Sequence, residues 1–283
     1  MKKTGLISLG AAAVAATSIL AGCSSAGGGS TNVSAADLAK AVIENMPKEK
    51  GYTVNEGIDF QAAISASGVN ADMKMKMDMN GDVAQLPSVD SHFKGTMNVS
   101  AAGRSEDQNV EMYIVADKSG KTATSYTKSN GRKWSKVTTD INSANSVYSA
   151  SIYQAIVDGK ADAKVNGKTE KIDGKDAYKV DVVLKGDVLE EALKSVSTTG
   201  ENIFSSSNAD LSKATIDADI YIYKDTKLPA KVSLDLKSLG ASMMGDMGSG
   251  AKVDVSKFDV SMDFKDYGEK TIKVPADVIN AAK

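Results

Sequence analysis

Four methionines stand at alternate positions of one short segment, and their thioethers are the first groups that could do chemistry. Charged residues separate Met73, Met75, Met77 and Met79. Thioethers are soft ligands that suit Cu(I). Alternate residues of a strand also share one face, and methionine fills cores and adaptable binding surfaces. No histidine or cysteine lies in the segment, so we favour a strand with an apolar, methionine-lined face. A metal-handling protein is the weaker alternative.

The composition excludes several kinds of chemistry. The 283 residues include one cysteine and one histidine (His92), and the formal net charge is −2. A single cysteine forms no intramolecular disulfide and builds no multi-cysteine metal site. The charge does not suggest a nucleic-acid partner. No Gly-x-Ser-x-Gly elbow, phosphate-binding glycine loop or calcium-binding loop is present. We therefore expect a protein that is not an enzyme and has no cofactor.

The lone cysteine, Cys23, ends an export signal. Lys2 and Lys3 precede an uncharged stretch at 6–20, which is too short for an ordinary membrane span. The stretch leads into Leu20-Ala21-Gly22-Cys23, which resembles the signal of bacterial lipoproteins. The resemblance implies that residues 1–22 are a removed signal peptide and that Cys23 carries acyl chains such as palmitate. Two or more chains anchor a protein stably, so we expect it at the extracytoplasmic face of the cell membrane.

The mature chain divides into a tether and one domain. Residues 23–33 are rich in Gly and Ser and predict a flexible linker. Residues 34–283 contain three or four helical patterns among many segments of alternating polarity. Their length suits one large β domain or two small ones. We expect one domain of 34–283.

The spacing of apolar residues places these elements. Helical spacing predicts helices at 34–46, 140–157, 188–196 and 275–282, the first ending before Pro47. Asn130-Gly131 and Asp173-Gly174 predict hairpin turns, and 240–250 reads as a glycine-rich flap bearing Met243, Met244 and Met247. Alternation predicts strands that include residues 60–66, 71–79, 110–114, 178–184, 216–222, 230–236 and 258–264.

These elements predict an α+β fold. About eleven strands with one polar and one apolar face favour antiparallel pairing. A sheet of that size has to curl. The apolar faces of the helices can be buried only against the inner face of this sheet. We expect a half-barrel with helices packed in the concave face and outward aspartates, including Asp217, Asp219, Asp259 and Asp263, on a solvated face.

The chain resembles the LolA-like superfamily of lipoprotein carriers, which includes LppX- and LprG-type lipoproteins and a poorly characterised Gram-positive branch. The segments that carry the resemblance are Cys23, 34–46, 130–134, 171–180, 223–229 and 258–267. The resemblance implies an eleven-stranded half-barrel with helices in its mouth, around an apolar cavity. Relatives bind acyl chains, lipids or glycolipids there.

Two main hypotheses of function follow. The first is a membrane-anchored lipoprotein that binds a lipid, acyl chain or lipoglycan between sheet and helices, for transport or presentation at the cell envelope. The second is a structural or interaction lipoprotein whose sheet is filled by its own side chains and which binds no small ligand. For the first, the predicted lining residues are Met73, Met75, Met77, Met112, Val180, Val182, Ile220, Val232 and Met262.

Overall fold

A computed structural model gives the fold of the main compact unit, Asn32–Lys283. No helix among the residues it describes is long and apolar enough to cross a membrane. The signal peptide, Cys23 and nearly all of the tether lie outside these residues, as does the helix expected at 188–196. The described residues are 33–66, 69–85, 89–117, 121–140, 150–185, 215–244 and 252–282.

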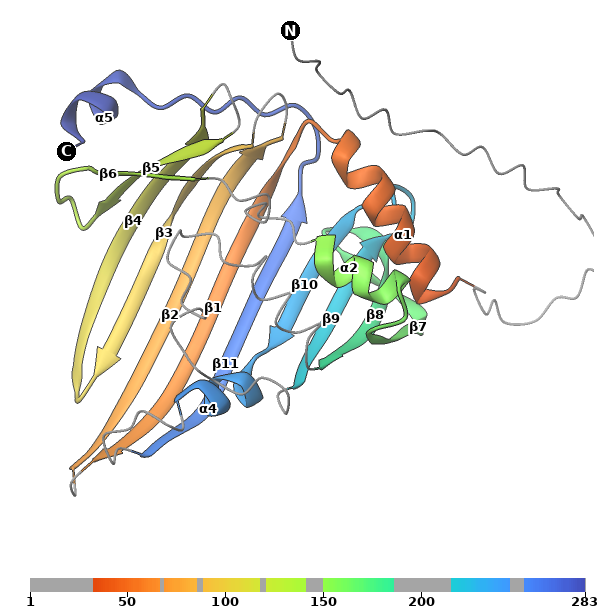
Figure 1. Cartoon of the computed structure of the whole chain (residues 1–283), viewed down its shortest axis with the longest axis horizontal. Coiled ribbons are helices and arrows are strands. Elements are labelled where there is room, and N and C mark those ends of the chain that lie inside the picture. The colour runs from red at the N-terminus through yellow and green to blue at the C-terminus, as the bar shows by residue number, and fades with distance from the viewer. Residues whose placement is uncertain are drawn as a thin grey trace, which may run out of the picture. The chain divides into compact units, whose positions relative to one another are not determined.

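Eleven antiparallel strands form one open sheet (Figure 1). Their order is β6-β5-β4-β3-β2-β1-β11-β10-β9-β8-β7, so the first half of the chain and the last half meet at the β1–β11 pair. This confirms the predicted fold class. The strands are β1 (Gly51–Ala66), β2 (Val69–Ala84), β3 (Asp90–Ala101), β4 (Arg104–Ala116), β5 (Thr122–Ser129), β6 (Ser135–Asp140), β7 (Asp162–Ile172), β8 (Lys175–Lys185), β9 (Thr215–Tyr223), β10 (Pro229–Asp235) and β11 (Lys252–Lys265).

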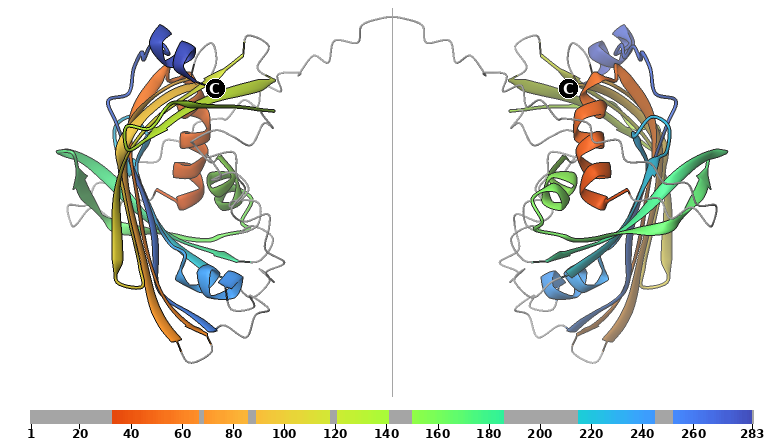
Figure 2. Two further views of the ribbon diagram at one scale, coloured as in Figure 1. Left: turned by 90° about the vertical axis from the view of Figure 1, so that its left-hand side faces the viewer. Right: turned by 90° about the vertical axis from the view of Figure 1, so that its right-hand side faces the viewer.

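The sheet curves around the helices that the structure describes between residues 33 and 244 (Figure 2). These are α1 (Ala35–Asn45), α2 (Ala150–Val157) and α4 (Lys237–Met244). Ser34 caps α1 by accepting a hydrogen bond from the backbone N–H of Asp37. The helix runs into a short 3₁₀ turn, Met46–Lys48, that contains Pro47, as expected. Leu38 and Val42 of α1 and Ile152 and Ile156 of α2 are buried in the main core with the inner face of the sheet.

Both predicted hairpin turns are confirmed. Asn130 and Gly131 have φ values of 47° and 67°, and they separate β5 from β6. Asp173 and Gly174 have φ values of 49° and 77° between β7 and β8. Positive φ at both central residues matches the right-handed twist of a hairpin, and Asn, Asp and Gly adopt it most readily.

Three predictions of local structure are corrected. Residues 240–244, expected in a flap, belong to α4, because Leu239 is fully buried and Gly240 packs against Val255 and Phe258. Residues 245–250 of that expected flap lie outside the described residues. Within the described part of 140–157, residue 140 ends β6 and α2 begins only at residue 150. Finally, β1 begins nine residues before the expected start at Phe60.

A second cluster lies on the convex face, where a solvated surface was expected. Tyr113, Tyr126, Trp134 and Val278 are all buried there. Val278 belongs to α5 (Ala276–Ala281), so this helix, unlike the others, does not pack in the concavity. The alternation of Val110, Met112 and Ile114 with Glu111 and Tyr113 predicts Tyr113 on the polar face of this strand. The prediction was wrong because the segment after β11 returns across that face and covers it.

Candidate functional site

The inner face of the sheet carries an apolar region that its helices only partly cover. It joins β1, β2 and β3 through cross-strand pairs such as Ile58 with Met77, Met77 with Met97, and Met75 with Val99. Each side chain is partly exposed, in contrast to the closed core beside it. We call this region the methionine surface; it comprises Ile58, Met73, Met75, Met77, Met97 and Val99.

The nine predicted lining residues are divided between the methionine surface and the main core. Met73, Met75 and Met77 lie on the methionine surface. Met112 pairs with the buried Phe93 and packs, partly exposed, against the main core. The others are buried in the main core with α1 and α2, and four of them form one row across β8, β9, β10 and β11. That row is Val180, Ile220, Val232 and Met262, and Val182 lies beside it.

Sequence reasoning missed four inner-face residues. Met97 and Val99 alternate in the same way as the β2 methionines, in a segment that was not assigned as a strand. Ile58 lies in the first part of β1, which was also not assigned. The fourth is Glu56 of β1, whose cross-strand partners are Met262 and Met79. Burial raises the pKa of the Glu56 carboxyl to about 7. The signal for Glu56 was its spacing of two from Val54 and Ile58, which places it in the apolar register.

The geometry disfavours a single-ion site on the β2 methionines. Alternate residues lie about 7 Å apart along a strand, so the four thioethers start from Cα atoms spread over about 20 Å. The described residues contain no group of three or more His, Cys, Asp or Glu able to hold a metal ion. His92 stacks on Tyr113 with ring centroids 4.0 Å apart, and its Nε2 lies 3.0 Å from Glu111 Oε1. It therefore has structural partners, which the sequence did not suggest.

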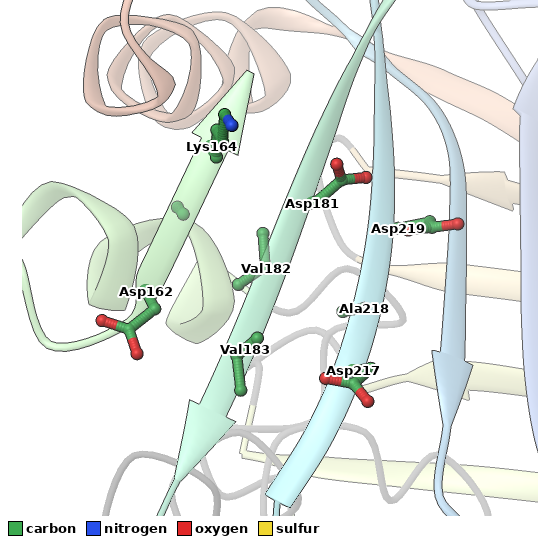
Figure 3. A pocket seen from close by; sticks show the side chains of 9 residues that line it. Asp162, Lys164, Asp181, Val182, Val183, Asp217, Ala218 and Asp219 are labelled. Carbon is green, nitrogen blue, oxygen red and sulfur yellow. The ribbon is translucent and has the colours of Figure 1, made fainter. Parts of the chain in front are cut away.

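Two shallow grooves lie mainly on the convex face. One, of about 540 Å³, is lined by residues of β7, β8 and β9, including Asp181, Asp217 and Asp219 (Figure 3). The other, of about 440 Å³, extends across β10, β11, β1 and β2. Both are acidic and open.

Lysines of the same face neutralise much of this charge. Lys179 Nζ lies 2.9 Å from Asp219 Oδ2. Lys257 Nζ lies 2.6 Å from Asp59 Oδ2 and 3.3 Å from Asp259 Oδ2. The hydrogen bond from Lys257 holds the pKa of the Asp59 carboxyl below its usual value. This pattern is that of a solvated strand face with paired charges, as the alternation predicted.

Several solved structures of low sequence identity are similar to this chain. One is the crystal structure of the Mycobacterium tuberculosis lipoprotein LppX, with 13% identity, a TM-score of 0.45 and coverage of 84% of this chain and 97% of that one. Another is a DUF1329 family protein from Desulfovibrio piger (10% identity, TM-score 0.24, covering 86% and 95%). A third is a beta-barrel-like DUF1849 protein from Brucella abortus (11%, 0.24, covering 77% and 98%).

The family assignment of this chain comes from its amino-acid sequence. No curated protein matches it significantly. One family model, described as a family of unknown function (DUF6612), matches residues 34–283. This range includes every described strand of the sheet and all four described α-helices. The chain therefore belongs to DUF6612.

Proposed function

We propose that this protein is an extracytoplasmic lipoprotein, anchored through Cys23, that binds an acyl chain on the methionine surface and carries or presents it at the cell envelope. The observation that carries the proposal is the partial exposure of six neighbouring apolar side chains on the concave face of the sheet. An apolar surface of this kind favours an apolar partner. No bond is made or broken, so the proposal is of a binding protein and not an enzyme.

The chemistry of the surface suits an alkyl chain. Each methylene group that leaves water contributes about 0.8 kcal/mol. Methionine side chains have three rotatable bonds and adapt to chains of different shape. Cross-strand neighbours such as Met77 and Met97 provide a continuous apolar strip across the strands. A long chain lying on this strip would bury many methylenes without needing a directional contact.

The part of the concave face that packs against α1 and α2 favours a second candidate function. Val180, Val182, Ile220 and Val232 are at most 4% exposed, so their side chains already fill the space under α1 and α2. If the methionine surface is filled in the same way, the protein is a structural or interaction lipoprotein. The two candidates differ in one measurable property, the presence of a bound lipid.

Exchange of Met77 for glutamine tests the binding surface. Met77→Gln places an amide in the middle of the apolar strip, and we expect acyl-chain affinity to fall about tenfold. The measurement is displacement of a fluorescent fatty-acid analogue from the mature domain, together with native mass spectrometry of the purified protein. Lys76→Gln is the matched control, because its exposed side chain lies on the opposite face of β2.

The outcomes separate the two candidates. Binding that weakens in Met77→Gln but not in Lys76→Gln supports the acyl-chain function. If wild-type protein contains no lipid after repeated purification and does not bind the fatty-acid analogue, the result supports the structural or interaction lipoprotein. Equal affinity in both variants would place any binding elsewhere on the molecule.

Exchange of Cys23 tests the anchor separately. Cys23→Ser removes the thiol that the proposal makes the site of acylation. We expect the full chain to move from the membrane pellet to the soluble fraction when cells are fractionated, with no loss of the folded domain. Retention in the pellet at the wild-type level would contradict anchoring through Cys23.

A further inference from the structure

Glu56 is a charged residue in a cross-strand row that is otherwise apolar, between Met262 of β11 and Met79 of β2. In the described strands β10, β11, β1, β2 and β3, it is the only charged residue on the inner face. The alternation of β1 fixes this orientation, since Tyr52, Val54, Ile58 and Phe60 share the same face. A carboxylate in such surroundings is unfavourable unless a hydrogen-bond donor meets it.

Glu56 lies at the border between the main core and the methionine surface. In the direction of Val54, the core is closed, and the flanking Met79 and Met262 are 6% and 8% exposed. In the direction of Ile58, the methionine surface begins, and the side chains are partly exposed. Glu56 thus lies at the end of the methionine surface that adjoins the main core.

The Glu56 carboxylate has no hydrogen-bonding or ionic partner among the described residues. Burial is the cause of its raised pKa. Its neighbour Met79 leans away toward β3, because its Sδ lies 2.7 Å from the position that a Cβ atom of Gly95 would occupy. The absence of a side chain at Gly95 therefore draws Met79 off the Glu56 side of the strand.

We propose that Glu56 receives the polar head of the bound amphiphile, and that this head is a hydrogen-bond donor, an amino or hydroxyl group. The inference rests on the proposed function, because the acyl chain would lie on the methionine surface. Beside Glu56, the partly exposed Met77, Met75 and Met73 extend along β2 for about 14 Å, which accommodates an alkyl chain. A carboxylate head would meet a like charge, so free fatty acids should be poor ligands above neutral pH.

Three probes with the same alkyl chain test this inference: dodecylamine, 1-dodecanol and dodecanoate. Each is titrated at pH 8, below its solubility limit or micelle concentration, against a polarity-sensitive fluorophore bound to the mature domain. We expect at least one donor probe to bind at least tenfold more tightly than dodecanoate. Preference for the amine alone identifies a cationic head, and equal preference for amine and alcohol identifies recognition of a hydrogen-bond donor that needs no charge. Both results support the proposal.

Two variants complete the test. In Glu56→Gln and Glu56→Leu, we expect the preference for donor probes to fall below threefold while chain binding persists, which shows that the domain is folded. Equal binding of all three probes by the wild type, or a preference that both variants retain, overturns the role of Glu56 and leaves the acyl-chain function intact. Failure of the wild type to bind any probe overturns both proposals.

Discussion

Glu56→Gln is expected to raise the free energy of unfolding by up to about 3 kcal/mol at pH 8 and to change it little at pH 4.5. Burial moves the pKa of this carboxyl from 4.5 to about 7 in the folded state. One pKa unit corresponds to about 1.4 kcal/mol. Glutamine is neutral at every pH and close to the protonated carboxyl in shape, so it removes the cost of burying a charge.

The direction of the effect follows from proton binding. Because the folded pKa lies above the unfolded one, the folded state holds this proton more tightly between about pH 4.5 and 7. Stability from this group is therefore greatest below pH 4.5 and is lost as the pH rises through 7. Salt-bridged carboxyls such as Asp59, whose pKa is lowered, act in the opposite direction.

The measurement is the difference between variant and wild type in urea denaturation at a series of pH values. Taking the difference cancels the contribution of the other carboxyls. Glu106→Gln is the control, because Glu106 lies on the same face of the sheet but is exposed. A stability gain that is the same at pH 4.5 and pH 8 would show that glutamine acts through packing and not through charge.

The same residue shows where prediction from sequence succeeded and where it failed. Regular alternation, as in Met73 to Met79, identified strands, because each register position had the polarity of its face. At Glu56, a charged residue in the apolar register interrupted the pattern, so the first nine residues of β1 were not recognised. A residue that breaks the local pattern and is still accommodated by the fold is a candidate for function.

Contacts between segments that are distant in the sequence could not be predicted either. Tyr113 has charged neighbours and was assigned to solvent, because nothing local indicates that residues after β11 cover it. Turns were predictable, since Asn130-Gly131 and Asp173-Gly174 act within a few residues. The division of the concave face into a closed core and a methionine surface depends on where α1 and α2 pack, so the nine predicted lining residues could not be sorted in advance.

Gly95→Ala is expected to lower the free energy of unfolding by about 3 kcal/mol or more. An added Cβ would overlap the carbonyl oxygen of Asp78 and would lie 2.8 Å from the Cα of Met79. Both are backbone atoms of the adjacent strand, so relief requires β2 and β3 to separate. Overpacking typically costs about 1–3 kcal/mol, and a backbone contact belongs at the upper end of that range.

Gly167→Ala provides the matched control in urea denaturation. Gly167 is also a strand glycine, in β7, but no heavy atom lies within 4 Å of the position that its Cβ would occupy, and its φ is not positive. We expect a change within about 0.5 kcal/mol for this variant. Similar losses in the two variants would mean that glycine is required for general reasons of strand conformation. A loss confined to Gly95→Ala would show that β2 and β3 approach closely at the Glu56 end of the methionine surface, where Met79 folds over the glycine.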